Sequence, residues 1–114
     1  MAQHSGVLRS ALAWDWPGGV SCPNDRFIRQ MRRLADACDW ASDVRIRDHK
    51  FRGYVTHLST CAHAAYTARY ACERSGHEAV REARRAVGLL RSSRDALGPL
   101  WANLLLHVDA GGVL

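Results

Sequence analysis

The sequence predicts a single all-α domain, residues 1–114, folded as a compact bundle of four or five helices. Apolar residues recur every three or four positions along most of the chain, which is the period of a helix with one buried face. The interruptions are short turn signals, Pro-Gly-Gly at 17–19, Ser-Gly at 75–76 and Gly-Pro at 98–99. Proline and paired glycines do not continue a helix cheaply, so these positions separate the predicted elements.

The first helix is predicted to be short, around residues 7–14. The second begins near Asn24, whose side chain suits an N-cap, and Asp25 favours the positive end of the helix dipole. It runs to about Trp40. Residues 44–47 alternate apolar and charged side chains, which fits a short extended piece as well as a continuing helix.

The longest helix is predicted from about Asp48 to Arg74, and two more follow, over about 77–94 and from about residue 99. The long helix has an apolar seam on its front. Its back carries small and nearly uncharged residues, namely Gly53, Thr60, Ala64, Thr67 and Ala71. Such a helix packs on two sides, which favours a central place in the bundle; a contact with another subunit is the alternative.

The charge of the chain comes almost entirely from arginine. Fifteen arginines and one lysine give a net charge of +5, which favours an acidic partner such as nucleic acid. A genome rich in G and C explains an excess of arginine over lysine. The positions of the arginines therefore carry the argument, because a guanidinium group grips phosphate with two parallel hydrogen bonds.

On the second helix, the arginines lie away from the apolar side at 100° per residue. Arg29 and Arg33 fall opposite the apolar side, together with Trp40, and Arg26 and Arg32 lie on the flanks. These four arginines form one predicted nucleic-acid-binding patch. Trp40 is the tryptophan that most deserves a test as a base-stacking platform, since it shares their face.

The fourth predicted helix carries a second and clearer stripe, formed by Arg81, Arg84, Arg85 and Arg91. Gly88 lies within it and leaves a gap where a backbone or a phosphate could approach. Glu78 and Glu82 precede Arg81 and Arg85 by three residues, an ion-pair spacing, whereas Arg84 and Arg91 have no acid three or four residues before them. This stripe is the first predicted phosphate-binding surface.

No catalytic or cofactor motif is recognisable, so we expect a non-enzymatic protein without a cofactor or bound metal. The strongest candidates for a metal or nucleophile site are His57, Cys61 and His63. His63 points to another side of the helix, and Cys61 lies on the apolar seam, where a thiol is usually inert.

The four cysteines form no CxxC pair, and nothing resembles a signal peptide or a membrane span. The sequence therefore predicts reduced, mostly buried cysteines in a cytoplasmic protein without a membrane partner.

A small, basic, all-helical domain of about five helices, with arginines such as Arg29, Arg33, Arg81, Arg84 and Arg91 on its outer faces, resembles the small subunit of RNA-guided CRISPR effector complexes. It is similar in the same way to the helical-bundle accessory proteins of diversity-generating retroelements. Both resemblances imply an accessory subunit of a ribonucleoprotein complex, such as one of antiviral defence. They imply larger protein subunits as partners, several copies of the chain, and RNA or single-stranded DNA held as a target or displaced strand.

A protein-interaction module is the alternative from another class. Such an adaptor, inhibitor or antitoxin would use the small-residue face of the long helix, and its arginines would meet an acidic protein surface.

Overall fold

The computed structural model describes residues 3–110, without the side chain of Tyr54, and within this range the all-α prediction is confirmed. Five helices follow one another, and the described residues form no sheet. They are α1 (His4–Ala11), α2 (Asp25–Ser42), α3 (His49–Ala71), α4 (Gly76–Leu97) and α5 (Leu100–Ala110).

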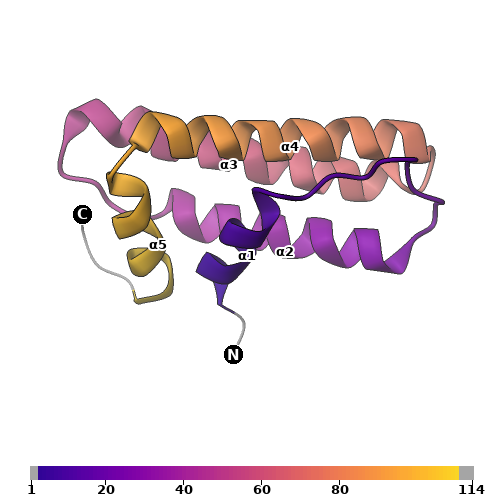
Figure 1. The fold of residues 1–114 in the computed structure, drawn as a ribbon, viewed down its shortest axis with the longest axis horizontal. Helices are drawn as coiled ribbons and strands as arrows, with labels where there is room; N and C mark the ends of the chain where they lie inside the picture. The colour runs from indigo at the N-terminus through magenta and orange to yellow at the C-terminus, as the bar shows by residue number, and fades with distance from the viewer. Residues whose placement is uncertain (1–2, 111–114) are drawn as a thin grey trace.

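The three long helices form the core, and α3 packs against both α2 and α4 (Figure 1). The back of α3 explains this arrangement, since Ala64 and Ala71 are buried within the bundle while Gly53 and Thr60 stay exposed. Small side chains on two sides let both neighbours approach one helix closely. The expected central position of this helix is therefore confirmed.

Side-chain caps define where the long helices begin. Asn24 accepts a hydrogen bond from the backbone N–H of Phe27 at 3.0 Å, and Asp48 accepts one from the N–H of Lys50 at 3.0 Å. Each cap satisfies a donor that the first helical turn leaves without a partner. The predicted starts of the three long helices are confirmed to within about two residues, a normal spread for helix ends, whereas α1 begins at His4, three residues earlier than predicted. Residues 43–48 are not helical, which favours the extended alternative for 44–47.

Residues 12–24, which we call the strap, connect α1 to α2 by running along α4 (Figure 1). Trp16 fixes the middle of the strap to α2. Its ring is buried and meets Phe27 edge-on at 5.7 Å, and its indole N–H donates to the side-chain oxygen of Gln30 at 3.2 Å. The indole thus buries its apolar body and still satisfies its only donor.

The end of the strap meets the start of α4 at Gly76. A β-carbon at this position would overlap the carbonyl oxygen of Val20, so only glycine admits the close approach of the two backbones. The sequence predicted such an approach at Gly88 instead. An added β-carbon there meets nothing within 4 Å, so no backbone fills that gap.

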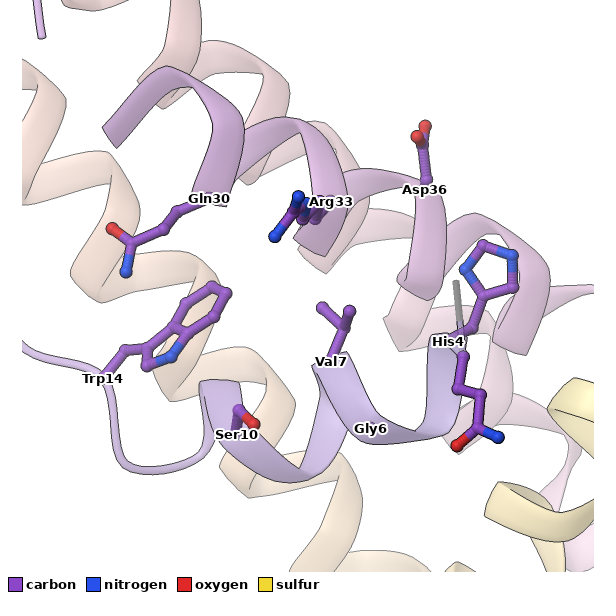
Figure 2. Close-up of a pocket in the computed structure, with 9 residues that line it drawn as sticks. His4, Gly6, Val7, Ser10, Trp14, Gln30, Arg33 and Asp36 are labelled. Atoms are coloured by element: carbon purple, nitrogen blue, oxygen red, sulfur yellow. The ribbon is translucent and has the colours of Figure 1, made fainter. Parts of the chain in front are cut away.

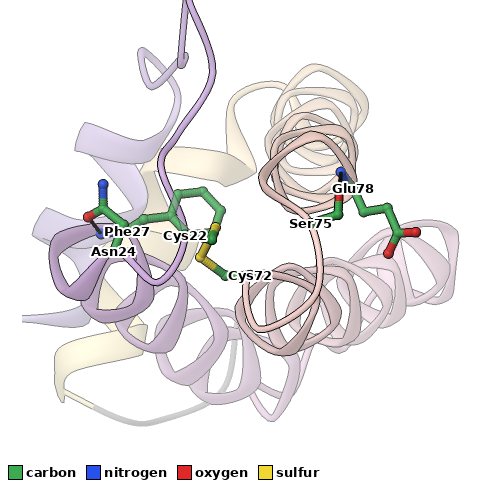
Figure 3. The surroundings of a disulfide bond; sticks show 6 residues. All are labelled: Cys22, Asn24, Phe27, Cys72, Ser75 and Glu78. Carbon is green, nitrogen blue, oxygen red and sulfur yellow. Dashed lines mark hydrogen bonds between the residues drawn. A yellow bond between two sulfur atoms is a disulfide. The ribbon is translucent and has the colours of Figure 1, made fainter.

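The prediction of four reduced cysteines was wrong for two of them, because Cys22 and Cys72 form a disulfide (Figure 3). Their Cα atoms are 5.3 Å apart, and the bond joins the strap to the residue after α3 across 50 positions of sequence. Spacing did not reveal the pair, since only the fold brings the two ends together. The other two, Cys38 and Cys61, are free and buried as expected.

The two short helices, α1 and α5, also contact each other. Asp109 accepts hydrogen bonds from both the hydroxyl and the backbone N–H of Ser5, the latter at 3.2 Å. The hydrogen bond from the Ser5 hydroxyl has the largest influence and lowers the pKa of Asp109. Burial raises this pKa and the backbone N–H bonds lower it again, so that it lies below its usual value. This contact ties the beginning of the chain to its last helix.

Candidate nucleic-acid interface

Two of the four predicted arginines on α4 are engaged within the molecule. Arg84 donates from Nε to Asp15 at 3.0 Å and from Nη2 to the carbonyl oxygen of Trp16 at 3.4 Å. Arg91 donates from Nε to the carbonyl oxygen of Leu12 at 2.9 Å. Both therefore hold the strap, using acceptors about 70 to 80 positions away in sequence.

The other two arginines of α4 differ from each other. Arg85 pairs with Glu82 at 3.5 Å, as their spacing predicted. Glu78 does not pair with Arg81, because it pairs with Arg74 at 3.5 Å instead. Within the part of the chain that the structure describes, Arg81 is then the one member of the α4 stripe with no hydrogen bond or ion pair.

All four predicted arginines of α2 are exposed. Among residues 3–110, no hydrogen bond or ion pair engages Arg26, Arg29, Arg32 or Arg33. Their placement on an outer helix surface agrees with the helical wheel. The α2 arginines, unlike Arg84, Arg85 and Arg91 of α4, keep all their donors available to a partner outside the molecule.

A groove of about 670 Å³ runs between α1 and α2, and of these arginines Arg33 lines it (Figure 2). Arg33 and Val7 extend into it from opposite helices, and the Trp14 ring stands at one end next to Gln30. His4 and Asp36 border the other end. The groove is lined by Gln3, His4, Gly6, Val7, Ser10, Trp14, Gln30, Arg33 and Asp36.

A smaller hollow of about 240 Å³ lies next to this groove, between the strap and the first turns of α2. Gln30 lines both, with Arg26 in the small hollow and Arg33 in the large one. Residues 26, 30 and 33 fall on one row of a helix. The two cavities and their arginines therefore follow α2 in a single line.

The C-terminal half of α2 has the opposite charge. Asp36 and Asp39 lie there, Asp43 follows directly after the helix, and the hydroxyl of Tyr66 donates to Asp36 at 3.4 Å. Burial, followed by repulsion from Asp36 and Asp43, raises the pKa of Asp39 above its usual value. The outer surface of α2 is thus basic in its first half and acidic in its second.

The structure places two tryptophans, Trp40 and Trp14, differently from what the sequence predicted for a base-stacking residue. Trp40 is 58% exposed, but it stacks on His4 at 5.3 Å and lines a hollow against α5 rather than the α1–α2 groove. Trp14, which the sequence placed with the apolar residues of the first helix, lies beside Arg33 in that groove. Only the path of the strap brings Trp14 there, so no local pattern pointed to it.

The residues considered for catalysis or metal binding do not converge. Cys61 is fully buried, whereas His57 and His63 are exposed. Among the described residues, no group of three or more histidine, cysteine, aspartate or glutamate side chains could hold a metal ion.

Comparison of the chain with family models, with curated proteins and with solved structures found no match. In the described part of the chain, no helix combines the length and the apolar character that a membrane span requires. The case for a function therefore depends on the geometry of the α2 surface alone.

Proposed function

We propose that the protein is a non-catalytic nucleic-acid-binding protein whose primary contact surface is the N-terminal half of α2. The observation that carries this proposal is that the arginines of α2 have no partner within the described part of the molecule, whereas two arginines of α4 bind the strap. Arg26, Arg29, Arg32 and Arg33 are exposed and uncommitted among the described residues, whereas Arg84 and Arg91 hold the strap. Free guanidinium groups on one surface suit phosphate, and each contact adds affinity by releasing counterions.

The adjoining groove favours a single strand over a duplex. Trp14 is half-buried and its ring borders the space into which Arg33 extends. A splayed base stacked on this ring would place its phosphate near Arg33, and base–aromatic stacking is worth about 1–3 kcal/mol per base. In a duplex, paired bases are not available for such stacking, so an unpaired strand of RNA or DNA fits better.

The line from Arg26 to Arg33 sets the length of the contact. Seven residues of helix span about 10 Å, which corresponds to about three nucleotides of a stacked strand. Arg29 lies between them on the same helix, and Arg81 is an additional free arginine on α4. We therefore expect a short contact dominated by the phosphate backbone, without sequence readout.

A contact this short suits an accessory subunit that acts in several copies or beside larger subunits, since linked sites multiply affinity. The similarity in format to the small subunits of CRISPR effector complexes implies the same organisation, and stays a prediction. So does the cytoplasmic location, against which the Cys22–Cys72 disulfide weighs, because disulfides persist mainly in oxidising compartments.

Two matched double variants test the proposal. Arg29→Gln with Arg33→Gln removes two free arginines of α2, and Arg84→Gln with Arg91→Gln removes the same charge from α4. Binding of labelled single-stranded RNA and DNA is measured by fluorescence anisotropy over a salt series. We expect the α2 variant to bind several-fold more weakly and to lose about 1.4 from the slope of log K against log salt, which is two single-strand phosphate contacts.

The α4 variant is the control for charge, and we expect it to keep the salt slope of the unmodified protein, because it loses no free arginine of the α2 surface. Its affinity should fall less than that of the α2 variant, through the looser placement of Trp14 on the strap. Equal losses in both variants would mean that net charge, and not the α2 surface, attracts the strand. If the unmodified protein binds neither strand at low salt, the proposal is wrong, and the arginines instead suit the acidic protein partner of the alternative.

A further inference from the structure

The two free cysteines of the bundle lie against each other in its core. The sulfur atoms of Cys38 on α2 and Cys61 on α3 are 3.1 Å apart, and both side chains are fully buried. Cys61 also donates to the carbonyl oxygen of Ala86 on α4 at 3.2 Å. A disulfide needs a sulfur–sulfur distance of about 2.05 Å, so a shift of roughly 1 Å separates this pair from a covalent bond.

The position of this pair relative to the existing disulfide is also informative. Cys22 lies just before α2 and Cys72 is the residue after α3, so their bond joins the same two helices at one end. Cys38 and Cys61 are 23 positions apart and lie inside that loop of 50. The four cysteines thus form two nested pairs across one antiparallel pair of helices, and each has a partner.

The surroundings of the inner pair permit the closer approach. Ala35, Ala62 and Ala65 are fully or almost fully buried in the same two helices, and small side chains allow helices to pack closely. Oxidation would end the hydrogen bond from Cys61 to Ala86. It would leave no orphaned acceptor, because a carbonyl inside a helix also accepts the N–H four residues later.

We propose that Cys38 and Cys61 are a second disulfide site, and that the working form of the protein is an α2–α3 pair joined by two nested disulfides. This inference does not rest on nucleic-acid binding. It implies an oxidising environment, where disulfides form and persist, and therefore opposes the predicted cytoplasmic location.

The oxidant is a disulfide compound, such as glutathione disulfide or a disulfide oxidoreductase. The thiolate of one cysteine attacks the oxidant, forms a mixed disulfide and releases one reduced thiol. The other cysteine, deprotonated, then attacks the mixed disulfide at the sulfur of the first and releases the second reduced thiol. Cys38 and Cys61 together lose two protons and two electrons, and the oxidant gains them.

Burial of the two thiols determines at which stage of folding this exchange takes place. The hydrogen bond with Cys61, and then desolvation, raise the pKa of the Cys38 thiol well above its usual value, so the reactive thiolate is scarce in the folded core. The bond therefore forms before α2 and α3 have packed fully, or during a local opening of these helices.

The test begins with the full chain reduced in denaturant and refolded in a mixture of reduced and oxidised glutathione. The product is denatured without reductant, alkylated, digested and examined by mass spectrometry. We expect one peptide pair joined through Cys22 and Cys72 and another joined through Cys38 and Cys61, with no alkylated cysteine. Alkylated Cys38 and Cys61 in a product that contains the outer disulfide would overturn the proposal, as would a bond between an inner and an outer cysteine.

A variant with Cys22→Ala and Cys72→Ala checks that the inner pair forms by itself. We expect its mass to be lower than that of its reduced form by two hydrogen atoms, and to rise again with reductant. No mass change on reduction would contradict the inference. If this variant fails to fold, the unmodified chain is measured instead, and we expect its mass to rise by four hydrogen atoms on reduction; a rise of two would contradict the inference.

Discussion

Arg84 and Arg91 on α4 reach across to the strap, whereas Arg29 and Arg33 on α2 are exposed and have no hydrogen-bond or ion-pair partner among the described residues. In sequence the two sets look alike, since both are arginines on the polar side of an amphipathic helix. They differ in their neighbours. The strap runs along α4 and brings a carboxylate and two backbone carbonyls within reach of its arginines.

The comparison shows how an irregular segment is held in place by long side chains. The strap has no sheet partner and is not helical, so its carbonyls need other donors. The Arg84–Asp15 pair is exposed on both sides, and such pairs contribute only about 0–1 kcal/mol. Its role is to fix the path of the strap, which in turn places Trp14 beside Arg33 on α2.

The largest expected effect comes from two glycines of α4. Gly76→Ala places a β-carbon against the Val20 carbonyl of the strap and should destabilise the fold by about 1–3 kcal/mol, the usual cost of overpacking. Gly88→Ala meets open space in the same helix and should stabilise it by about 0.5–1 kcal/mol. Chemical unfolding of both variants measures the difference. Equal effects would mean that the strap does not pack on α4 as described.

A smaller effect is expected at the arginines that hold the strap. Arg84→Gln with Arg91→Gln should speed hydrogen exchange of the backbone amides in residues 12–24, because the segment loses three hydrogen bonds to α4. Arg29→Gln with Arg33→Gln removes the same charge and should leave that exchange unchanged. Faster exchange in both variants would remove the distinction between the two helices.

The smallest expected effect is on the strap at low pH. The backbone N–H of Trp16, and then Arg84, lower the pKa of Asp15 below its usual value of 3.8. A lowered carboxyl pKa means that the stabilisation is present above the unfolded pKa and is lost as the pH falls through the folded one. NMR signals of the strap should therefore change only below about pH 4.

Arg84→Gln is the matched variant for this titration. It removes one cause of the shift and keeps the N–H of Trp16, so the midpoint of Asp15 should rise part of the way toward its usual value. A midpoint that does not move would show that Arg84 has no influence on this carboxyl in solution.

Most of the fold could be predicted from the sequence because its signals are local. The helical period, the capping residues and the helix-breaking residues located five helices. The small side chains on the back of α3 indicated a helix packed on two sides. The exposed α2 arginines were also found this way, since the outer face of an amphipathic helix follows from its apolar one.

The rest depended on contacts between residues far apart in sequence. Asp15 meets Arg84 across 69 positions and Cys22 meets Cys72 across 50, and no periodicity encodes either pairing. Gly76 and Gly88 are equally compatible with a close approach until the path of the strap is known. Our proposal therefore ranks the α2 face ahead of the α4 face, the opposite of the order that the sequence predicted.

By itself the sequence determined the helices, their buried faces and the sign of the surface charge, because these follow from the spacing of side chains along one helix. Only the tertiary structure decided which arginines are available, which cysteines meet, and which aromatic ring stands beside a free guanidinium. Those outcomes depend on how a non-helical strap crosses the bundle. The physical reason is that a side chain's partner is set by proximity in space, which the packing of the whole chain determines.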